Sequence, residues 1–192
     1  TMHGHGFLHI TFREVIRAEH YPPNEHEKHI LNITLNAHQQ KAYDTLQKRI
    51  EENTFHTFLL FGITGSGKTQ VYIEAIREVL RKGKTAIVLV PEISLTPQAV
   101  RRFQLCFGEL VTVIHSQMSQ GERYDSWRLT KSGVYKIVVG PRSAIFAPLK
   151  NIGLIVVDEE QESSYKQYDM TPRYNARDVA IVRGKENNAV VL

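Results

Sequence analysis

The sequence predicts an α/β domain in which a parallel, doubly wound sheet is covered by helices on both faces. First, the expected strands are short and apolar throughout, which is typical of a sheet buried on both faces. Second, these strands alternate with segments of helical periodicity, which indicates parallel crossovers. Third, 192 residues of which 42% are hydrophobic and 23% charged are enough to bury one sizeable core.

Each expected helix has a local signal. Asn36 is a candidate N-cap for the first helix, whose apolar residues recur at helical spacing. A second helix is expected over 68–81, with Gly83 at the C′ position. Thr96 caps a third helix that ends near residue 108 and has proline at its first position. A capping box at 119–122 opens the fourth helix, and the fifth is expected over 175–184.

The expected strands are apolar or β-branched runs between these helices. They lie at 57–61, 85–90, 110–114, 136–139, 154–157 and 189–192. We expect a main domain over residues 35–192. Residues 1–34, interrupted by two prolines, are expected to be a lead-in or the remnant of an upstream domain.

Composition excludes several classes of protein. No run approaches the roughly 18 apolar residues of a membrane span, and no secretory signal is visible, so we expect no membrane partner. The single cysteine, Cys106, excludes an internal disulfide and favours a cytoplasmic location; on its expected helix it is interpreted as a buried thiol. The net charge of +4 permits an anionic partner without requiring one.

A phosphate-binding loop is the strongest functional signal. Residues 62–69 fit the pattern G-x-x-x-x-G-K-[ST] and lie between an expected strand and an expected helix. Such a loop turns successive amides toward phosphate, aided by the positive end of the helix. Lys68 would reach the β- and γ-phosphates, and the Thr69 hydroxyl would ligate Mg²⁺. The predicted nucleotide-binding residues are Gly62, Thr64, Gly65, Ser66, Gly67, Lys68 and Thr69.

Two carboxylates supply the second half of the predicted site. Asp158 and Glu159 end an apolar strand, and ligands of such folds bind at the carboxyl ends of strands. Asp158 would hold Mg²⁺, and Glu159 would orient or deprotonate the attacking water.

Five segments resemble motifs Q, I, Ia, Ib and II of superfamily-two helicases, and they occur in the helicase order. They are residues 36–39, 62–69, 90–98, 139–148 and 158–161. Segments 92–98, 142–148 and 165–178 are more specifically similar to the primosomal protein N′ family of bacterial replication-restart helicases. The similarity extends from about residue 35 to residue 192.

The resemblance implies a RecA-like P-loop NTPase lobe, truncated before motif III, of an ATP-dependent DNA helicase for primosome assembly and fork restart. It implies ATP and Mg²⁺ as cofactors and a nucleoid-associated protein. Gln39 would read the adenine edge. Partners would be single-stranded and forked DNA, other primosome proteins and single-strand binding protein. The implied DNA contacts, which include an aromatic-rich loop, are Ser94, Thr96, Arg142, Ser143, Tyr165, Lys166, Arg173 and Tyr174.

Two positions depart from the family pattern. Gln161 replaces the usual histidine of motif II, so a protonation-dependent link is in question, and Pro141 replaces a usual threonine. A second lobe with arginine fingers and a zinc-binding insertion would lie beyond this sequence. The isolated segment is therefore expected to bind nucleotide weakly and to hydrolyse it very slowly.

Other interpretations stay open at this stage. The motor interpretation includes another superfamily-two translocase or an RNA helicase, whereas a P-loop switch is a different class of protein. We expect Tyr124 and Trp127, at helical spacing, to belong to the core. For His115, a structural role and a place near nucleotide or DNA are equally weighted.

Overall fold

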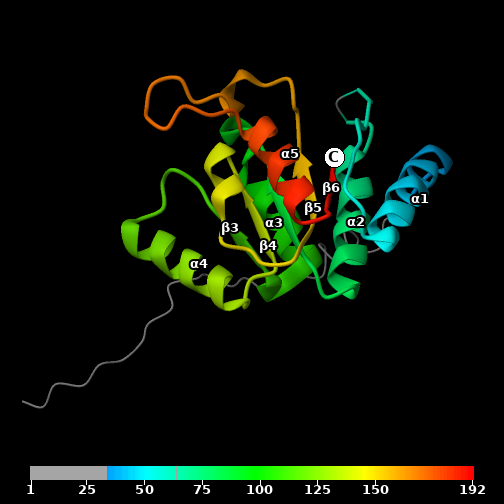
Figure 1. Ribbon diagram of the computed structural model, residues 1–192, viewed down its shortest axis with the longest axis horizontal. Coiled ribbons are helices and arrows are strands. Elements are labelled where there is room, and N and C mark those ends of the chain that lie inside the picture. Colours follow the sequence, from blue (N-terminus) through cyan, green and yellow to red (C-terminus); the bar gives the residue numbers. More distant parts are fainter. Residues whose placement is uncertain (1–33, 64) are drawn as a thin grey trace, which may run out of the picture.

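A six-stranded parallel sheet with helices on both faces forms the part of the chain that the computed structural model describes, residues 34–63 and 65–192 (Figure 1). The strand order is β1-β6-β5-β2-β4-β3. This confirms the predicted α/β class with a parallel, doubly wound sheet. The expectation for residues 1–34 falls almost wholly outside the described residues, as does Thr64.

The elements follow the predicted order along the chain. The strands are β1 (His56–Thr57), β2 (Thr85–Leu89), β3 (Val111–Val113), β4 (Ile137–Gly140), β5 (Ile152–Val157) and β6 (Val190–Val191). The α-helices are α1 (Ala37–Glu52), α2 (Lys68–Arg81), α3 (Pro97–Phe107), α4 (Gln120–Ser132) and α5 (Ala176–Glu186). Short 3₁₀ turns are η3 (Glu92–Ser94), η4 (Gly108–Leu110), η5 (Arg142–Phe146) and η6 (Ser163–Tyr165). Among the described residues, no helix is both long and apolar enough to span a bilayer.

Side-chain caps start three of the helices where the sequence predicts. The Asn36 side chain accepts a hydrogen bond from the Gln39 amide at 3.0 Å. Thr96 Oγ1 accepts from the amide of Ala99 at 3.2 Å, ahead of the proline that opens α3. The capping box at 119–122 is complete, with both hydrogen bonds present. These local bonds satisfy amides that have no partner within the helix, which fixes where each helix begins.

Two apolar layers enclose the sheet. On one face α1, α2 and α3 pack against alternate residues of the central strands, such as Val88 and Leu154. On the other face α5 and η5 pack against the intervening residues, such as Ile87 and Ile155. All five residues of β2 are buried, because this strand lies between β5 and β4 and is covered on both faces. The buried register of β2, β4 and β5 brings their carboxyl ends to one edge.

The outermost predicted strands are shorter than expected. The run 57–61 contributes only its first residue to β1; Phe58 donates its amide to the Val191 carbonyl at 2.8 Å. The partner strand β6 ends beside it, so the rest of the run is extended without a ladder. Leu59 and Phe61 are therefore exposed, whereas Phe58 and Leu60 pack on the core.

The expectation that Tyr124 and Trp127 belong to the core is wrong. Their exposed fractions are 62% and 45%, and Lys131 Nζ lies 4.8 Å from the centre of the Trp127 ring. Helix α4 instead turns its polar side inward: Thr112 Oγ1 of β3 donates to Ser126 Oγ at 3.3 Å. Hydrogen bonding decides which face is buried here, and helical spacing alone cannot show that. Cys106 is partly buried, as expected, and burial raises the pKa of its thiol.

Candidate nucleotide site

The loops that carry the predicted functional residues meet at one edge of the sheet. The loop 62–69 follows the extended run after β1, and Asp158 follows β5. The turn 90–96 follows β2, and η5 follows β4. Because all of these strands are parallel, their carboxyl ends share an edge, which is where ligands bind in folds of this kind.

The phosphate loop has the backbone conformation that its glycines permit. Gly65 and Gly67 both have φ of +82°, a region that residues with a Cβ rarely adopt. The Ser66 amide donates to the Ile63 carbonyl at 3.1 Å, and helix α2 starts at Lys68. Lys68 Nζ donates to the carbonyls of Gly62 at 2.8 Å and Ile63 at 3.3 Å. The lysine therefore closes the bend on itself in the absence of a phosphate.

Gln39 connects the first helix to this loop. Its Oε1 accepts from the Asn36 amide at 2.9 Å, and its Nε2 donates to the Ser66 carbonyl at 3.1 Å. Both ends of the amide group are thus engaged with the protein itself. The structure places Gln39 beside the phosphate loop, and recognition of an adenine edge would exchange at least one of these bonds.

The two predicted magnesium ligands are linked through a tyrosine. The Tyr72 hydroxyl donates to Thr69 Oγ1 at 3.0 Å and is also hydrogen-bonded to the Asp158 carboxyl group. The Asp158 amide donates to the Leu89 carbonyl at 2.9 Å, so β2 fixes the backbone from which the carboxylate projects. The sequence argument did not include Tyr72. Its spacing of three residues from Thr69, on one face of α2, is the signal that could have found it.

Glu159 adopts a strained backbone and has two side-chain neighbours. Its φ is +48°, in the left-handed region. Its Oε1 lies 3.9 Å from Lys68 Nζ, and its Oε2 accepts a hydrogen bond from Gln161 Nε2 at 2.7 Å. The residue that departs from the family pattern therefore positions the predicted water-orienting carboxylate directly.

The residues present fit a magnesium ion that arrives with phosphates. Among the described residues, no cluster of three or more His, Cys, Asp or Glu side chains could hold a metal alone. Magnesium in nucleotide sites takes only one or two protein ligands and completes its shell with phosphate oxygens and water. The Thr69 hydroxyl and the Asp158 carboxylate, joined through Tyr72, are such a set.

The turn after β2 presents two of the predicted DNA contacts at the same edge. Thr96 is exposed, although its hydroxyl also caps α3, and Ser94 is half-buried. Helix α3, which this turn opens, is tied to α2 because Arg102 Nη2 donates to Gln70 Oε1 at 3.0 Å. Gln70 is buried and directly follows Thr69, so the turn and the phosphate loop share a rigid connection.

Two residues predicted to touch DNA instead hold the aromatic-rich loop in place. Tyr165 is only 1% exposed, and its hydroxyl donates to the Leu89 carbonyl at 3.1 Å and to the Asp158 carbonyl. Its ring is packed in the core, so the structure does not support base stacking on Tyr165. Arg142 Nη1 donates to the carbonyls of Ser164 and Lys166, each at 3.2 Å. Both residues act on the loop from within the protein.

The remaining predicted DNA contacts differ in exposure. Ser143, Lys166 and Arg173 are exposed, and Lys166 Nζ lies 5.3 Å from the centre of the Tyr168 ring. Tyr174 is half-buried, with its ring edge-on to Phe146 at 4.9 Å. The structure thus brings exposed cations and an exposed aromatic ring together on the loop that follows Asp158.

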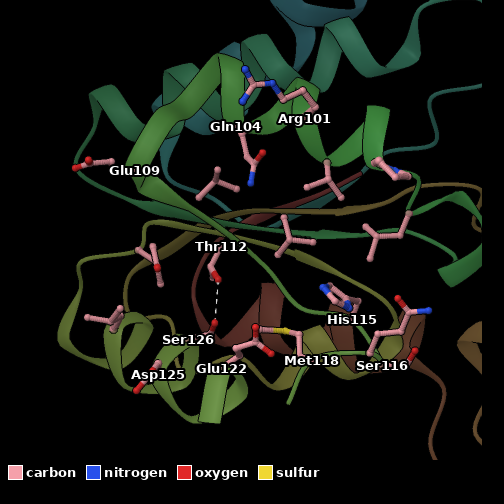
Figure 2. A pocket seen from close by; sticks show the side chains of 18 of the residues that line it. Arg101, Gln104, Glu109, Thr112, His115, Ser116, Met118, Glu122, Asp125 and Ser126 are labelled. Atoms are coloured by element: carbon pink, nitrogen blue, oxygen red, sulfur yellow. Dashed lines mark hydrogen bonds between the residues drawn. The ribbon is translucent and has the colours of Figure 1, made fainter. Parts of the chain in front are cut away.

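A separate groove of about 930 Å³ lies along β3 between α3 and α4 (Figure 2). His115, Met118 and Glu122 are among its lining residues, and the phosphate-loop residues 62–69 are not. The structure therefore places His115 in this groove at the sheet edge rather than at the phosphate loop. At one end the Ser116 amide donates to Glu92 Oε1 at 3.3 Å.

The buried carboxylate gives a first prediction, on pH. Burial raises the pKa of Asp158 above 3.8; the Tyr72 hydrogen bond and Lys68 oppose this, and Glu159 adds to it. Folding thus favours the protonated acid, and the stability that protonation contributes is present below pH 3.8 and lost as pH rises through the folded-state pKa. Without Mg²⁺ and nucleotide, Asp158→Asn is expected to be more stable than the wild type at pH 7.

Urea unfolding between about pH 8 and pH 4 measures this difference, which should shrink toward the acid end. Asp169→Asn, in the exposed part of the aromatic-rich loop, is the control and should show no such trend. A difference that stays constant with pH, or an Asn variant that is less stable at pH 7, would contradict the assignment.

The left-handed backbone of Glu159 gives a second prediction. Residues with a bulky side chain lose roughly 1–2 kcal/mol in this region, whereas asparagine adopts it readily. Glu159→Asn is expected to raise the free energy of unfolding by about 1 kcal/mol and the melting temperature by about 2–4 °C. Glu162→Asn is the matched control, because φ of Glu162 is −64° and no strain is relieved there. Equal effects of the two substitutions on calorimetric melting would refute the strain.

Comparison with known proteins gives a consistent result. The sequence model of the family described as "Type III restriction enzyme, res subunit" matches residues 32–182. The replication restart protein PriA of Bacillus subtilis (strain 168) is 46% identical over 187 residues, which is 97% of this chain. PriA of Chlamydia trachomatis serovar D is 49% identical over 159 residues, or 83% of this chain. These matches cover 23% and 21% of the relatives' own lengths.

The fold also has a solved counterpart. A structure of RecG bound to a three-way DNA junction superimposes with a TM-score of 0.59 and covers 90% of this chain and 23% of that one. At 21% sequence identity this similarity concerns the fold alone. The chain thus belongs to the family described as the res subunit of type III restriction enzymes, and it corresponds to about a quarter of the replication restart protein PriA.

Proposed function

We propose that this chain is the ATP-binding lobe of an ATP-dependent DNA helicase that acts in replication restart. The observation that carries the proposal is the meeting of the loop 62–69 and Asp158 at one sheet edge, with Thr69 and Asp158 joined through Tyr72. The names of the PriA relatives support the role in replication restart.

Lys68 is the residue that exchanges partners on nucleotide binding. In the structure its ammonium group donates to two neutral loop carbonyls, those of Gly62 and Ile63. Phosphate oxygens that enter the bend replace them with charge-assisted hydrogen bonds, which are roughly twice as strong. The loop amides and the amino end of α2 add further attraction for the anion.

The carboxylates divide the remaining work. Thr69 and Asp158 would hold magnesium, which when bound neutralises the phosphate charge. Glu159, held between Lys68 and Gln161, would orient or deprotonate the attacking water. An arginine from another lobe contributes about 10³–10⁵ to the rate in such enzymes, so this chain alone would hydrolyse ATP very slowly.

Single-stranded DNA would cross the same edge of the sheet. The exposed groups available for phosphate contact and stacking are Thr96, Ser143, Lys166, Tyr168 and Arg173. Interleaved cations and aromatic rings bind single strands with little sequence preference. Arg142 and Tyr165 contribute by fixing the loop that carries three of these groups.

The wider role is also part of the proposal. Forked DNA, other primosome proteins and single-strand binding protein are the partners we propose, in a cytoplasmic, nucleoid-associated protein. These partners rest on the family resemblance and on the names of the PriA relatives, of which this chain spans about a quarter.

Nucleotide binding gives a third prediction. Lys68→Ala is expected to weaken binding of a fluorescent ATP analogue with Mg²⁺ roughly tenfold to a hundredfold, because a charged hydrogen bond is worth about 1.5–3 kcal/mol. Lys82→Ala removes an exposed lysine at the other end of α2 and should bind like the wild type. Unchanged affinity in Lys68→Ala would remove the basis of the ATP site.

DNA binding gives a fourth prediction. Arg173→Ala is expected to weaken binding of an oligothymidylate and to reduce the slope of log affinity against log salt by about 0.7. Lys185→Ala, near the far end of α5, removes the same charge and should leave that slope unchanged. Measuring both with and without a non-hydrolysable ATP analogue also tests coupling: a P-loop switch that binds no DNA would show no oligothymidylate affinity in any variant.

A further inference from the structure

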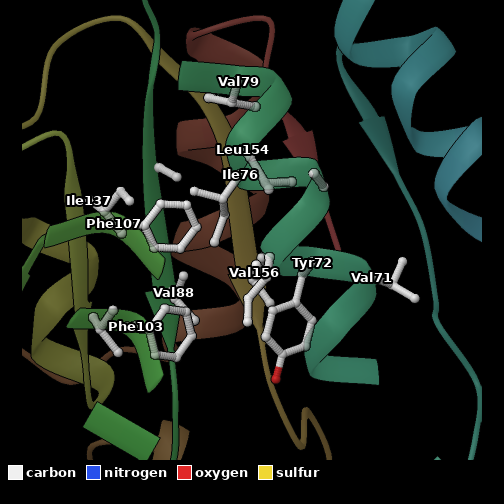
Figure 3. Packing of buried hydrophobic residues seen from close by; sticks show 14 of the residues in the cluster. Val71, Tyr72, Ile76, Val79, Val88, Phe103, Phe107, Ile137, Leu154 and Val156 are labelled. Carbon is white, nitrogen blue, oxygen red and sulfur yellow. The ribbon is translucent and has the colours of Figure 1, made fainter. Parts of the chain in front are cut away.

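Tyr72 occupies an unusual place for a core aromatic residue. It is 3% exposed, and its ring packs beside Val156 in the core cluster under α2 (Figure 3). Its hydroxyl points toward the start of the helix, where it lies 3.0 Å from Thr69 Oγ1. The same hydroxyl is hydrogen-bonded to the Asp158 carboxyl group. One buried hydroxyl therefore connects a residue of the phosphate loop to the end of β5.

We infer that Tyr72 is a positioning residue for the magnesium site, whose hydroxyl orients the Thr69 hydroxyl and the Asp158 carboxylate toward one ion. The inference rests on the proposed nucleotide function, and it assigns to Tyr72 a role that a phenylalanine of the same shape would not fill. Packing requires only the ring.

The donor and acceptor properties of the three groups support this role. A tyrosine or threonine hydroxyl has one proton and two lone pairs, and an ionised carboxylate only accepts. A hydroxyl that ligates a cation turns a lone pair to the ion and its proton away from it. Thr69 can then donate to Tyr72, and Tyr72 can donate to Asp158, so each group has one orientation that satisfies its neighbours.

The surroundings keep the tyrosine in its neutral, donating form. Burial and the nearby Asp158 charge raise the pKa of Tyr72 well above its ordinary value, and Arg102 opposes this only in part. Asp158 in turn feels burial, Glu159 and Lys68. A second-shell group of this kind typically contributes a factor of 10–100 to metal affinity when it orients a ligand.

Tyr72→Phe tests the inference, because it keeps the ring and removes only the hydroxyl. Binding of a fluorescent ATP analogue is titrated with Mg²⁺, and separately measured in EDTA. The Mg²⁺ concentration for half-maximal enhancement is expected to rise about tenfold or more in Tyr72→Phe. Affinity in EDTA should stay within about twofold of the wild type, a pattern that loss of core packing alone would not produce.

Tyr165→Phe is the matched control. It also removes a buried hydroxyl beside Asp158, but that hydroxyl donates to backbone carbonyls and not to the carboxylate. Its Mg²⁺ requirement should match the wild type. An equal shift in both variants, or no shift in Tyr72→Phe while the wild type binds Mg²⁺ and nucleotide together, overturns the inference alone. A wild type whose nucleotide binding ignores Mg²⁺, or is absent, overturns the proposed function.

Discussion

The hydrogen bonding at the carboxyl end of β2 is the interaction on which the rest of the site depends. The Leu89 carbonyl accepts from the Asp158 amide at 2.9 Å and from the Tyr165 hydroxyl at 3.1 Å. It therefore fixes the start of the acidic loop after β5 and the start of the aromatic-rich loop together. Because β2 is buried on both faces, this anchor cannot shift without disturbing the core.

Stability is lower at the site than elsewhere in the sheet, and the cause is local. Asp158 is a carboxylate in a desolvated position, and Glu159 has a left-handed backbone. Each feature costs free energy in the empty protein. Both place an acidic group beside the phosphate loop, where a cation and a triphosphate would offset the cost. The buried sheet beneath provides the rigidity that keeps these two residues in position.

Nucleotide and DNA sites are connected through short, buried contacts rather than through a long path. Tyr72 joins Thr69 to Asp158, and Arg102 joins α3 to α2 through Gln70. Arg177 donates to the Glu160 carbonyl at 3.1 Å and pairs with its carboxylate at 2.8 Å, which ties α5 to the acidic loop. The loops that would touch DNA therefore rest on the same residues that frame the nucleotide site.

The sequence by itself determined the strand and helix order, the capped starts of the helices, the phosphate loop and the position of Asp158. These features follow from interactions between residues one to four apart, or from apolar runs, which a sequence displays directly. The tertiary structure alone decided that Tyr165 is buried, that Trp127 faces outward and that Arg142 holds a loop. Those outcomes depend on partners about 20 to 80 residues away or on which face of α4 finds hydrogen bonds. Residue spacing carries no information about such partners.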